Sequence, residues 1–177
     1  MTAASRLVPL AALALVFGLW GAGCSSGPAV KTQAYAQLKS ERTFEHEFPV
    51  VWHGIESAFR KSKVVDRDPE EVNEVELKQL SKRTLETDWT YTQSRDKYVE
   101  YKVNGTPRRK QLQMRVKYEI LAKRVIGGTD VVVKATEEVE KLKEDGSPDG
   151  YEEMEPDTSR TAEILDKINL AIMAAAP

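Results

Sequence analysis

The sequence has one thiol, and its position limits the chemistry that this thiol can do. Cys24 ends an apolar run over residues 7–24 that follows a single basic residue, Arg6. A basic start, an apolar centre and an end made of small residues are typical of a secretory signal. Because the chain has no second cysteine, Cys24 cannot form an internal disulfide in an oxidising compartment. We therefore expect this thiol to be modified.

The end of the apolar run, Gly-Ala-Gly-Cys, resembles the signal of bacterial lipoproteins. The resemblance implies that residues 1–23 are a signal peptide, that Cys24 is lipidated, and that residues 24–40 tether a domain at 41–177 to a membrane. Ser25 after the cysteine implies an anchor at the outer membrane. We expect the periplasmic face of that membrane, with its outer surface as the second option. The alternative is a transmembrane helix, since a bilayer span needs about 20 apolar residues. Pro9 and three glycines interrupt the run, which favours the signal.

Other residues that could do chemistry form no recognisable constellation. The two histidines, His46 and His53, fall on different faces of their predicted elements, with His46 partly buried and His53 exposed. The sequence has neither a Gly-x-Ser-x-Gly nucleophile motif nor a phosphate-binding glycine loop. We predict no metal, no cofactor and no enzymatic activity. A net charge of −2 also argues against a general nucleic-acid binder.

The periodicity of apolar residues predicts the elements that must position any site. Alternation predicts strands at residues 42–48, 83–92, 98–103, 110–121 and 131–139, whereas spacing of three and four predicts long helices at 50–63 and about 159–172. A short helix is expected at 68–79, and residues 145–157 read as a loop. The pattern predicts an α+β fold, in which an antiparallel β-meander of about five strands is covered on one face by the two long helices, as in helix-grip folds.

A short motif resembles a known family. Leu-Glu-Thr-Asp-Trp-Thr-Tyr at residues 85–91 is similar to a motif of BamC, a family of outer-membrane lipoproteins. Trp52 in the first helix, the basic strand after the motif and the closing amphipathic helix fit the same plan, so the resemblance covers about residues 42–172. It implies a helix-grip domain and a non-enzymatic accessory or scaffold role in outer-membrane protein assembly.

Two kinds of binding site remain open. The first is a protein-binding face, for which the basic residues beside and along the strand at 110–121 are the candidates: Arg108, Arg109, Arg115 and Lys117. The partners would then be the membrane, through the lipid, and another envelope protein. The second is a pocket between sheet and helix for a small apolar ligand or lipid, lined by Phe59, Trp89, Tyr91 and Tyr118.

Overall fold

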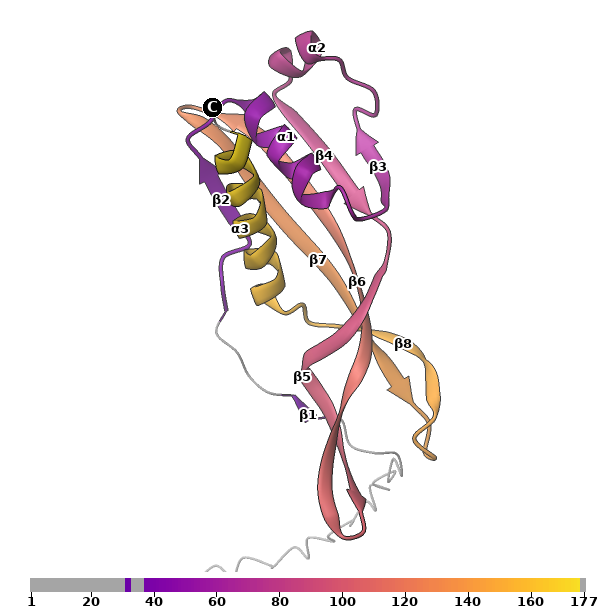
Figure 1. Cartoon of the computed structure of the whole chain (residues 1–177). Helices are drawn as coiled ribbons and strands as arrows, with labels where there is room; N and C mark the ends of the chain where they lie inside the picture. The colour runs from indigo at the N-terminus through magenta and orange to yellow at the C-terminus, as the bar shows by residue number, and fades with distance from the viewer. Residues whose placement is uncertain (1–30, 33–36, 176–177) are drawn as a thin grey trace, which may run out of the picture.

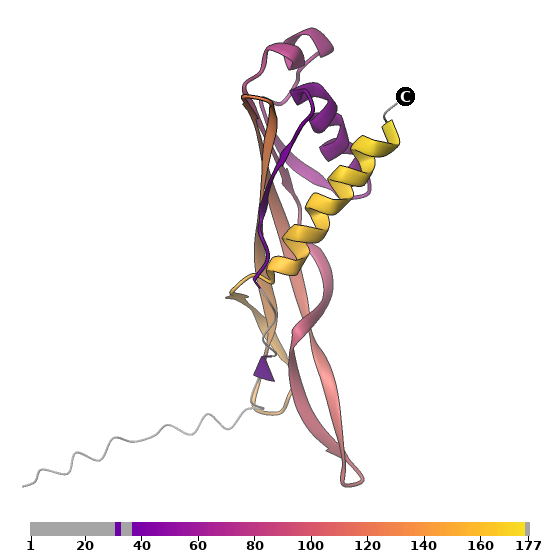
Figure 2. The same cartoon turned by 90° about the vertical axis from the view of Figure 1, so that its left-hand side faces the viewer.

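The computed structural model describes residues 31–32 and 37–175, which form one antiparallel sheet with two helices packed on one face (Figures 1 and 2). In these ranges the helices are α1 (Phe48–Phe59), α2 (Glu74–Gln79) and α3 (Thr158–Ala175). The strands are β1 (Lys31–Thr32), β2 (Glu41–Phe44), β3 (Val64–Asp68), β4 (Lys82–Thr87), β5 (Thr90–Val103), β6 (Thr106–Val125), β7 (Gly128–Leu142) and β8 (Pro148–Met154). No described helix is long and apolar enough to cross a membrane.

The long strands β6 and β7 form the spine of the sheet. One edge of β6 pairs first with β5, against residues 106–116, and then with β4, against residues 119–123. The outer edge of β7 likewise pairs with β2 at residues 129–132 and with β8 at residues 137–142. The sheet therefore has an upper tier in the order β2-β7-β6-β4-β3 and a lower tier in the order β1-β5-β6-β7-β8.

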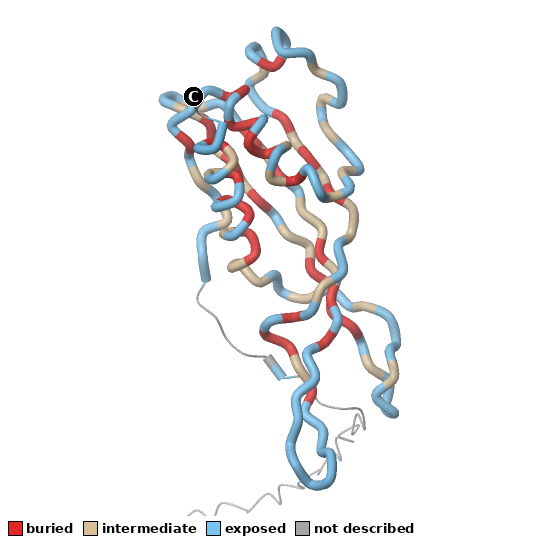
Figure 3. The backbone as a smooth tube through the Cα atoms, viewed as in Figure 1, coloured by how far each residue is buried: buried red, intermediate tan, exposed pale blue. Residues whose placement is uncertain are grey.

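The main core lies between the upper tier and helices α1 and α3 (Figure 3). Helix α1 starts with Pro49 in its first turn, where the missing N–H costs nothing, and buries one face: Phe48, Val51, Trp52, Ile55 and Phe59. Helix α3 adds Ile164, Leu165, Ile168 and Ile172. The two helices approach closely at Gly54, which has no side chain to separate them. Burial of each of the large side chains stabilises the fold by about 1.5–3 kcal/mol.

The lower tier has little apolar packing. Its buried apolar side chains are Met114 and Val116 of β6, together with a small cluster of Val99, Leu112 and Val139. Beyond it, β5 and β6 continue as a hairpin whose residues 100–111 are all exposed, and the hairpin turns at Asn104 and Gly105, both with positive φ (Figure 3). The lower tier is thus a projection from the helix-covered part of the molecule.

Charged side chains are buried where the two tiers meet. Glu137 on β7 is 1% exposed, and neither of its carboxylate oxygens has a hydrogen-bond partner in the described part of the chain. Arg160 of α3 places Nε 3.5 Å from Glu137 Oε1 and donates from Nη2 to the carbonyl oxygen of Gln93 at 3.1 Å. Residues 94–97 of β5 bulge out of its pairing with β6. Within this bulge Lys97 Nζ donates a hydrogen bond to Asp96 at 2.7 Å. Polar contacts therefore seat the start of α3 on the sheet.

The predicted meander of about five strands under two long helices is wrong. The described chain has eight strands, and residues 64–68 and 148–154 are strands that we did not predict. At about 3.3 Å per residue the 20 residues of β6 extend about 65 Å, whereas the 18 residues of α3 extend about 27 Å. The helices therefore cannot cover the sheet. The predicted strand at 83–92 is also two strands, β4 and β5, which pair with different parts of β6.

Candidate functional site

Aromatic and basic side chains gather on the open face of the sheet, opposite the helices. We call this set the Trp89 surface; it comprises Trp89, Tyr91, Arg115, Lys117 and Tyr151. The guanidinium carbon of Arg115 lies 4.6 Å from the ring centre of Trp89 and 4.9 Å from that of Tyr151. Lys117 Nζ lies 5.6 Å from the Trp89 ring, and the rings of Tyr91 and Tyr151 meet edge to face at 6.1 Å. The Arg115 guanidinium therefore contacts two aromatic rings.

Strand register explains why these side chains share a face. In β6 the even-numbered residues Leu112, Met114 and Val116 are buried, so the odd-numbered Arg115 and Lys117 point to the open side. Tyr91 of β5 is the direct partner of Arg115, and cross-strand partners project to the same side. Tyr151 of β8 pairs with Glu140 of β7, two residues from Glu138, which is the partner of Arg115 on that side. Strands β5, β6 and β8, and Trp89 between β4 and β5, thus contribute to one surface.

Carboxylates hold both cations of this surface in place. Arg115 donates to Glu138 Oε2 from Nε at 2.6 Å, and its Nη2 lies 2.5 Å from the same oxygen. The hydrogen bond with Glu138 raises the pKa of the Arg115 guanidinium above its ordinary value. Lys117 donates to Glu86 at 3.0 Å. Both cations are therefore oriented by carboxylates.

The backbone of Trp89 is fixed by its neighbour. The Asp88 carboxylate accepts a hydrogen bond from the Trp89 N–H at 2.8 Å and another from Lys63 Nζ at 2.6 Å. The bond from Lys63 lowers the pKa of Asp88 below its ordinary value, so this carboxylate stays ionised. Trp89 itself is partly exposed and Tyr91 is 65% exposed. The surface is a preorganised set of apolar faces and charged donors, which suits binding.

The four residues predicted to bind a partner do not form one site. Arg115 and Lys117 belong to the Trp89 surface. Arg108 and Arg109 lie farther along β6 in the hairpin, where the guanidinium carbon of Arg109 stacks 4.5 Å from the Tyr98 ring centre and its Nε lies 3.5 Å from Glu100. The predicted basic face is thus divided between the open face of the sheet and the hairpin.

The predicted apolar pocket is also divided. Phe59 and Tyr118 contact each other on the helix side, with ring centres 6.0 Å apart, and both pack in the main core. Burial raises the pKa of the Tyr118 hydroxyl. Trp89 and Tyr91 lie on the opposite side of the sheet, as their contacts with Arg115 require. These four side chains therefore cannot line a common pocket.

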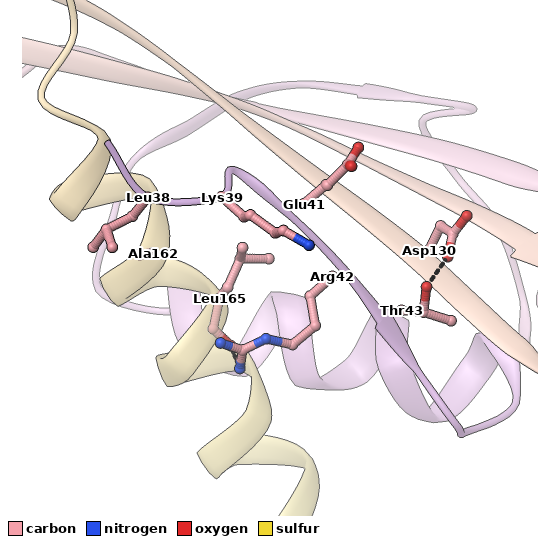
Figure 4. Close-up of a pocket in the computed structure, with 8 residues that line it drawn as sticks. All are labelled: Leu38, Lys39, Glu41, Arg42, Thr43, Asp130, Ala162 and Leu165. Atoms are coloured by element: carbon pink, nitrogen blue, oxygen red, sulfur yellow. Dashed lines mark hydrogen bonds between the residues drawn. The ribbon is translucent and has the colours of Figure 1, made fainter. Parts of the chain in front are cut away.

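Two hollows among the described residues are open and polar. One of about 570 Å³ lies between β2 and α3 (Figure 4), where Arg42 reaches Asp166 at 2.8 Å and Thr43 donates to Asp130 at 2.6 Å. Another of about 700 Å³, between α1, β3 and α2, has a rim rich in glutamate. Charged side chains dominate both rims, so neither hollow suits a small apolar ligand.

The remaining predicted residues have separate outcomes. His53 is exposed, as predicted, and its Nε2 lies 3.2 Å from Glu74. His46 is exposed rather than partly buried, because β2 ends at Phe44 and leaves it in the following loop. Within the described ranges no group of three or more His, Cys, Asp or Glu side chains could hold a metal ion. Cys24 and the signal peptide lie outside the described residues.

Sequence reasoning missed two members of this region. Tyr151 falls in a stretch rich in Gly, Pro and acid that reads as a loop, and only pairing with β7 makes it a strand. Glu138 lies among the charged residues that interrupt the apolar alternation of β7, so no signal in the sequence indicated its role.

A comparison with protein-family models finds no match, and a search of curated proteins finds no similar sequence.

Proposed function

We propose that this chain is a lipid-anchored binding module of the bacterial envelope, which holds another envelope protein through the Trp89 surface. On this proposal its role is that of an accessory or scaffold in outer-membrane protein assembly. It acts by contact rather than by catalysis.

The observation that carries the proposal is the composition and rigidity of the Trp89 surface. Tryptophan, tyrosine and arginine are the residues that most often dominate the energy of protein–protein interfaces. Here they are preassembled, with Arg115 held between two aromatic rings and Glu138. A surface that is already ordered loses little side-chain entropy when a partner binds.

The anchor and the assembly role are supported by the sequence. The apolar run ending at Cys24 resembles a lipoprotein signal, and residues 85–91 resemble the BamC motif. Two residues of that motif, Trp89 and Tyr91, belong to the Trp89 surface. If Cys24 carries lipid, mass spectrometry of the membrane-extracted protein should show loss of residues 1–23 and added acyl chains, and Cys24→Ala should leave an unprocessed precursor. An unmodified thiol in the mature protein would exclude the anchor.

The binding proposal can be tested by quantitative co-purification from detergent-solubilised envelopes of the source bacterium. If Trp89 and Arg115 are central to the interface, Trp89→Ala and Arg115→Ala should each weaken binding of the partner by about 2 kcal/mol, or roughly 30-fold in Kd. Lys123→Ala is the matched control, because Lys123 is exposed on the same face of β6 outside the Trp89 surface. Circular dichroism and urea midpoints establish that the variants fold.

We expect wild type and Lys123→Ala to co-purify the same envelope protein in equal amounts. Trp89→Ala and Arg115→Ala should not recover it. Equal recovery by all four proteins would refute the Trp89 surface as the interface. Recovery of a small apolar molecule in place of any protein would refute the scaffold role and favour a ligand-binding module.

A further inference from the structure

The first described residues leave the domain beside the β5–β6 hairpin. Strand β1 pairs antiparallel with β5, with Lys31 opposite Tyr98 and Thr32 opposite Lys97 (Figure 1). Lys31 also forms an ion pair with Glu100. Because β5 runs toward the hairpin turn, the antiparallel chain is directed toward that same turn as it passes from Thr32 to Lys31. The α3 C-terminal end lies at the opposite end of the molecule (Figure 2).

The length of chain between Lys31 and the predicted anchor matches the length of the hairpin. Cys24 precedes Lys31 by seven positions, and seven extended residue-to-residue steps reach at most about 25 Å. The hairpin extends six residues from Tyr98 to Asn104, or about 20 Å at 3.3 Å per residue. A lipid on Cys24 therefore keeps the bilayer surface within about 25 Å of Lys31, a reach that includes the hairpin turn.

The hairpin turn has the side chains that an anionic bilayer surface attracts. Tyr101 and Val103 are 48% and 47% exposed. Residues 98–110 contain four exposed cations, which are Lys102, Arg108, Arg109 and Lys110. Their single acidic residue, Glu100, is already paired with Lys31 and Arg109. Lys and Arg side chains are attracted to an anionic leaflet, and tyrosine favours the headgroup region.

We propose that hairpin residues 98–110 dock on the anionic headgroup surface of the bilayer in which the Cys24 lipid is embedded. The inference rests on the anchor proposed above and adds an orientation to it. With the hairpin turn at the membrane, the long axis of the sheet stands away from the bilayer. The helix-covered upper tier is then the part farthest from the membrane.

The test uses the full lipidated protein, purified from membranes and reconstituted into vesicles. Because lipid occupies the Cys24 thiol, Val103→Cys introduces a unique thiol near the turn for an environment-sensitive fluorophore. Ile126→Cys is the control, because Ile126 is fully exposed at the other end of β6. Vesicles contain phosphatidylcholine with or without phosphatidylglycerol, and lipid-borne doxyl groups quench any probe close to the bilayer.

We expect strong quenching at position 103 and none at 126 when phosphatidylglycerol is present. Replacing Lys102, Arg108, Arg109 and Lys110 with glutamine should reduce the quenching at position 103 several-fold, and high salt should do the same because it screens exposed charges. Equal quenching at the two positions, or quenching that the glutamine variant retains, would overturn the docking proposal.

Mass spectrometry of the same sample separates this inference from the proposed function. A lipidated protein whose position-103 probe is not quenched refutes docking and leaves the anchor in place. Absence of lipid refutes the anchor; Cys24→Ala is then combined with Val103→Cys to keep the thiol unique, and quenching only by phosphatidylglycerol vesicles supports docking by the hairpin.

Discussion

Replacing Gly54 with alanine should destabilise the protein, although alanine is the better helix former. Gly54 lies in the middle of α1, where this helix approaches α3. A methyl group at position 54 would lie 2.6 Å from Ile172 Cγ1 and 3.4 Å from the carbonyl oxygen of Ile168. The first distance is far below van der Waals contact, so one helix or the Ile172 side chain must shift.

Two opposing free energies set the magnitude. Glycine to alanine in a helix interior gains about 1 kcal/mol from backbone propensity. Overpacking of a buried contact costs about 1–3 kcal/mol. Ile172 is 2% exposed and Cγ1 is the inner part of its side chain, so it has little room to rotate away. We expect a net loss of about 1 kcal/mol in the free energy of unfolding.

Urea denaturation followed by circular dichroism measures this change in the free energy of unfolding. An unchanged slope m would show that the variant exposes as much surface on unfolding as wild type does. Ser57→Ala is the matched control, because Ser57 is an exposed residue of the same helix and should gain a few tenths of a kcal/mol. Combining Gly54→Ala with Ile172→Ala should cost less than the sum of the single changes, because the new methyl group fills part of the cavity. If Gly54→Ala stabilises the protein as much as Ser57→Ala does, the close contact between α1 and α3 is refuted.

Two further predictions concern the core and its buried charge. Ile168→Ala should lower the free energy of unfolding by about 2–5 kcal/mol, whereas the exposed Lys167→Ala should change it by less than about 0.5 kcal/mol; similar urea midpoints for the two variants would contradict the buried face of α3. Burial raises the pKa of Glu137, against the attraction of Arg160 and Lys97, so the folded protein binds this proton more tightly than the unfolded chain. Stability from this group is present below the unfolded-state pKa of about 4.3 and is lost as pH rises through the higher folded-state pKa. The free energy of unfolding of Glu137→Gln should therefore rise relative to that of wild type as pH rises through this window. Urea titrations that give the same difference between the two proteins from about pH 4 to about pH 8 would exclude the effect.

Burial along β6, α1 and α3 could be predicted because its pattern is local. The alternation of Leu112, Met114, Val116 and Ile120 predicts their burial, and the spacing along the helix at 159–172 predicts that of Ile168; both are confirmed. The amphipathic face of α1 is confirmed in the same way, including Trp52 and Phe59 at 0% and 2% exposed.

The candidate site was predicted in part, because strand parity holds only within a continuous strand. Leu85 and Thr87 are buried, but the chain leaves the β-ladder at Asp88 and Trp89 and resumes in β5. The alternation therefore does not continue across the break, and Trp89 and Tyr91 lie on the open face. Arg115 and Lys117 were assigned to the correct, outward face because β6 is continuous there.

Pairing between distant segments could not be read from local pattern. Residues 148–154 form a strand only because β7 supplies the ladder partners. Glu137 did carry a signal, since it falls on the alternating face of Val131, Val133 and Val139, and a charge at such a position indicates a buried ion pair. Its partner Arg160 comes from a helix 23 residues later, which no periodicity in β7 can reveal.

The separation of α1 from α3 along the chain has a consequence for how the protein folds. The apolar face of α1 is covered by a helix that begins roughly 100 residues later, and β2 pairs with a strand almost as distant, Glu41 facing Val132. Synthesis at about 5–20 residues per second leaves α1 without its cover for on the order of 5–20 s. Domains dominated by such distant contacts fold slowly, and their exposed apolar segments are prone to aggregate. The nascent chain is therefore expected to depend on a chaperone that shields α1 until α3 is available.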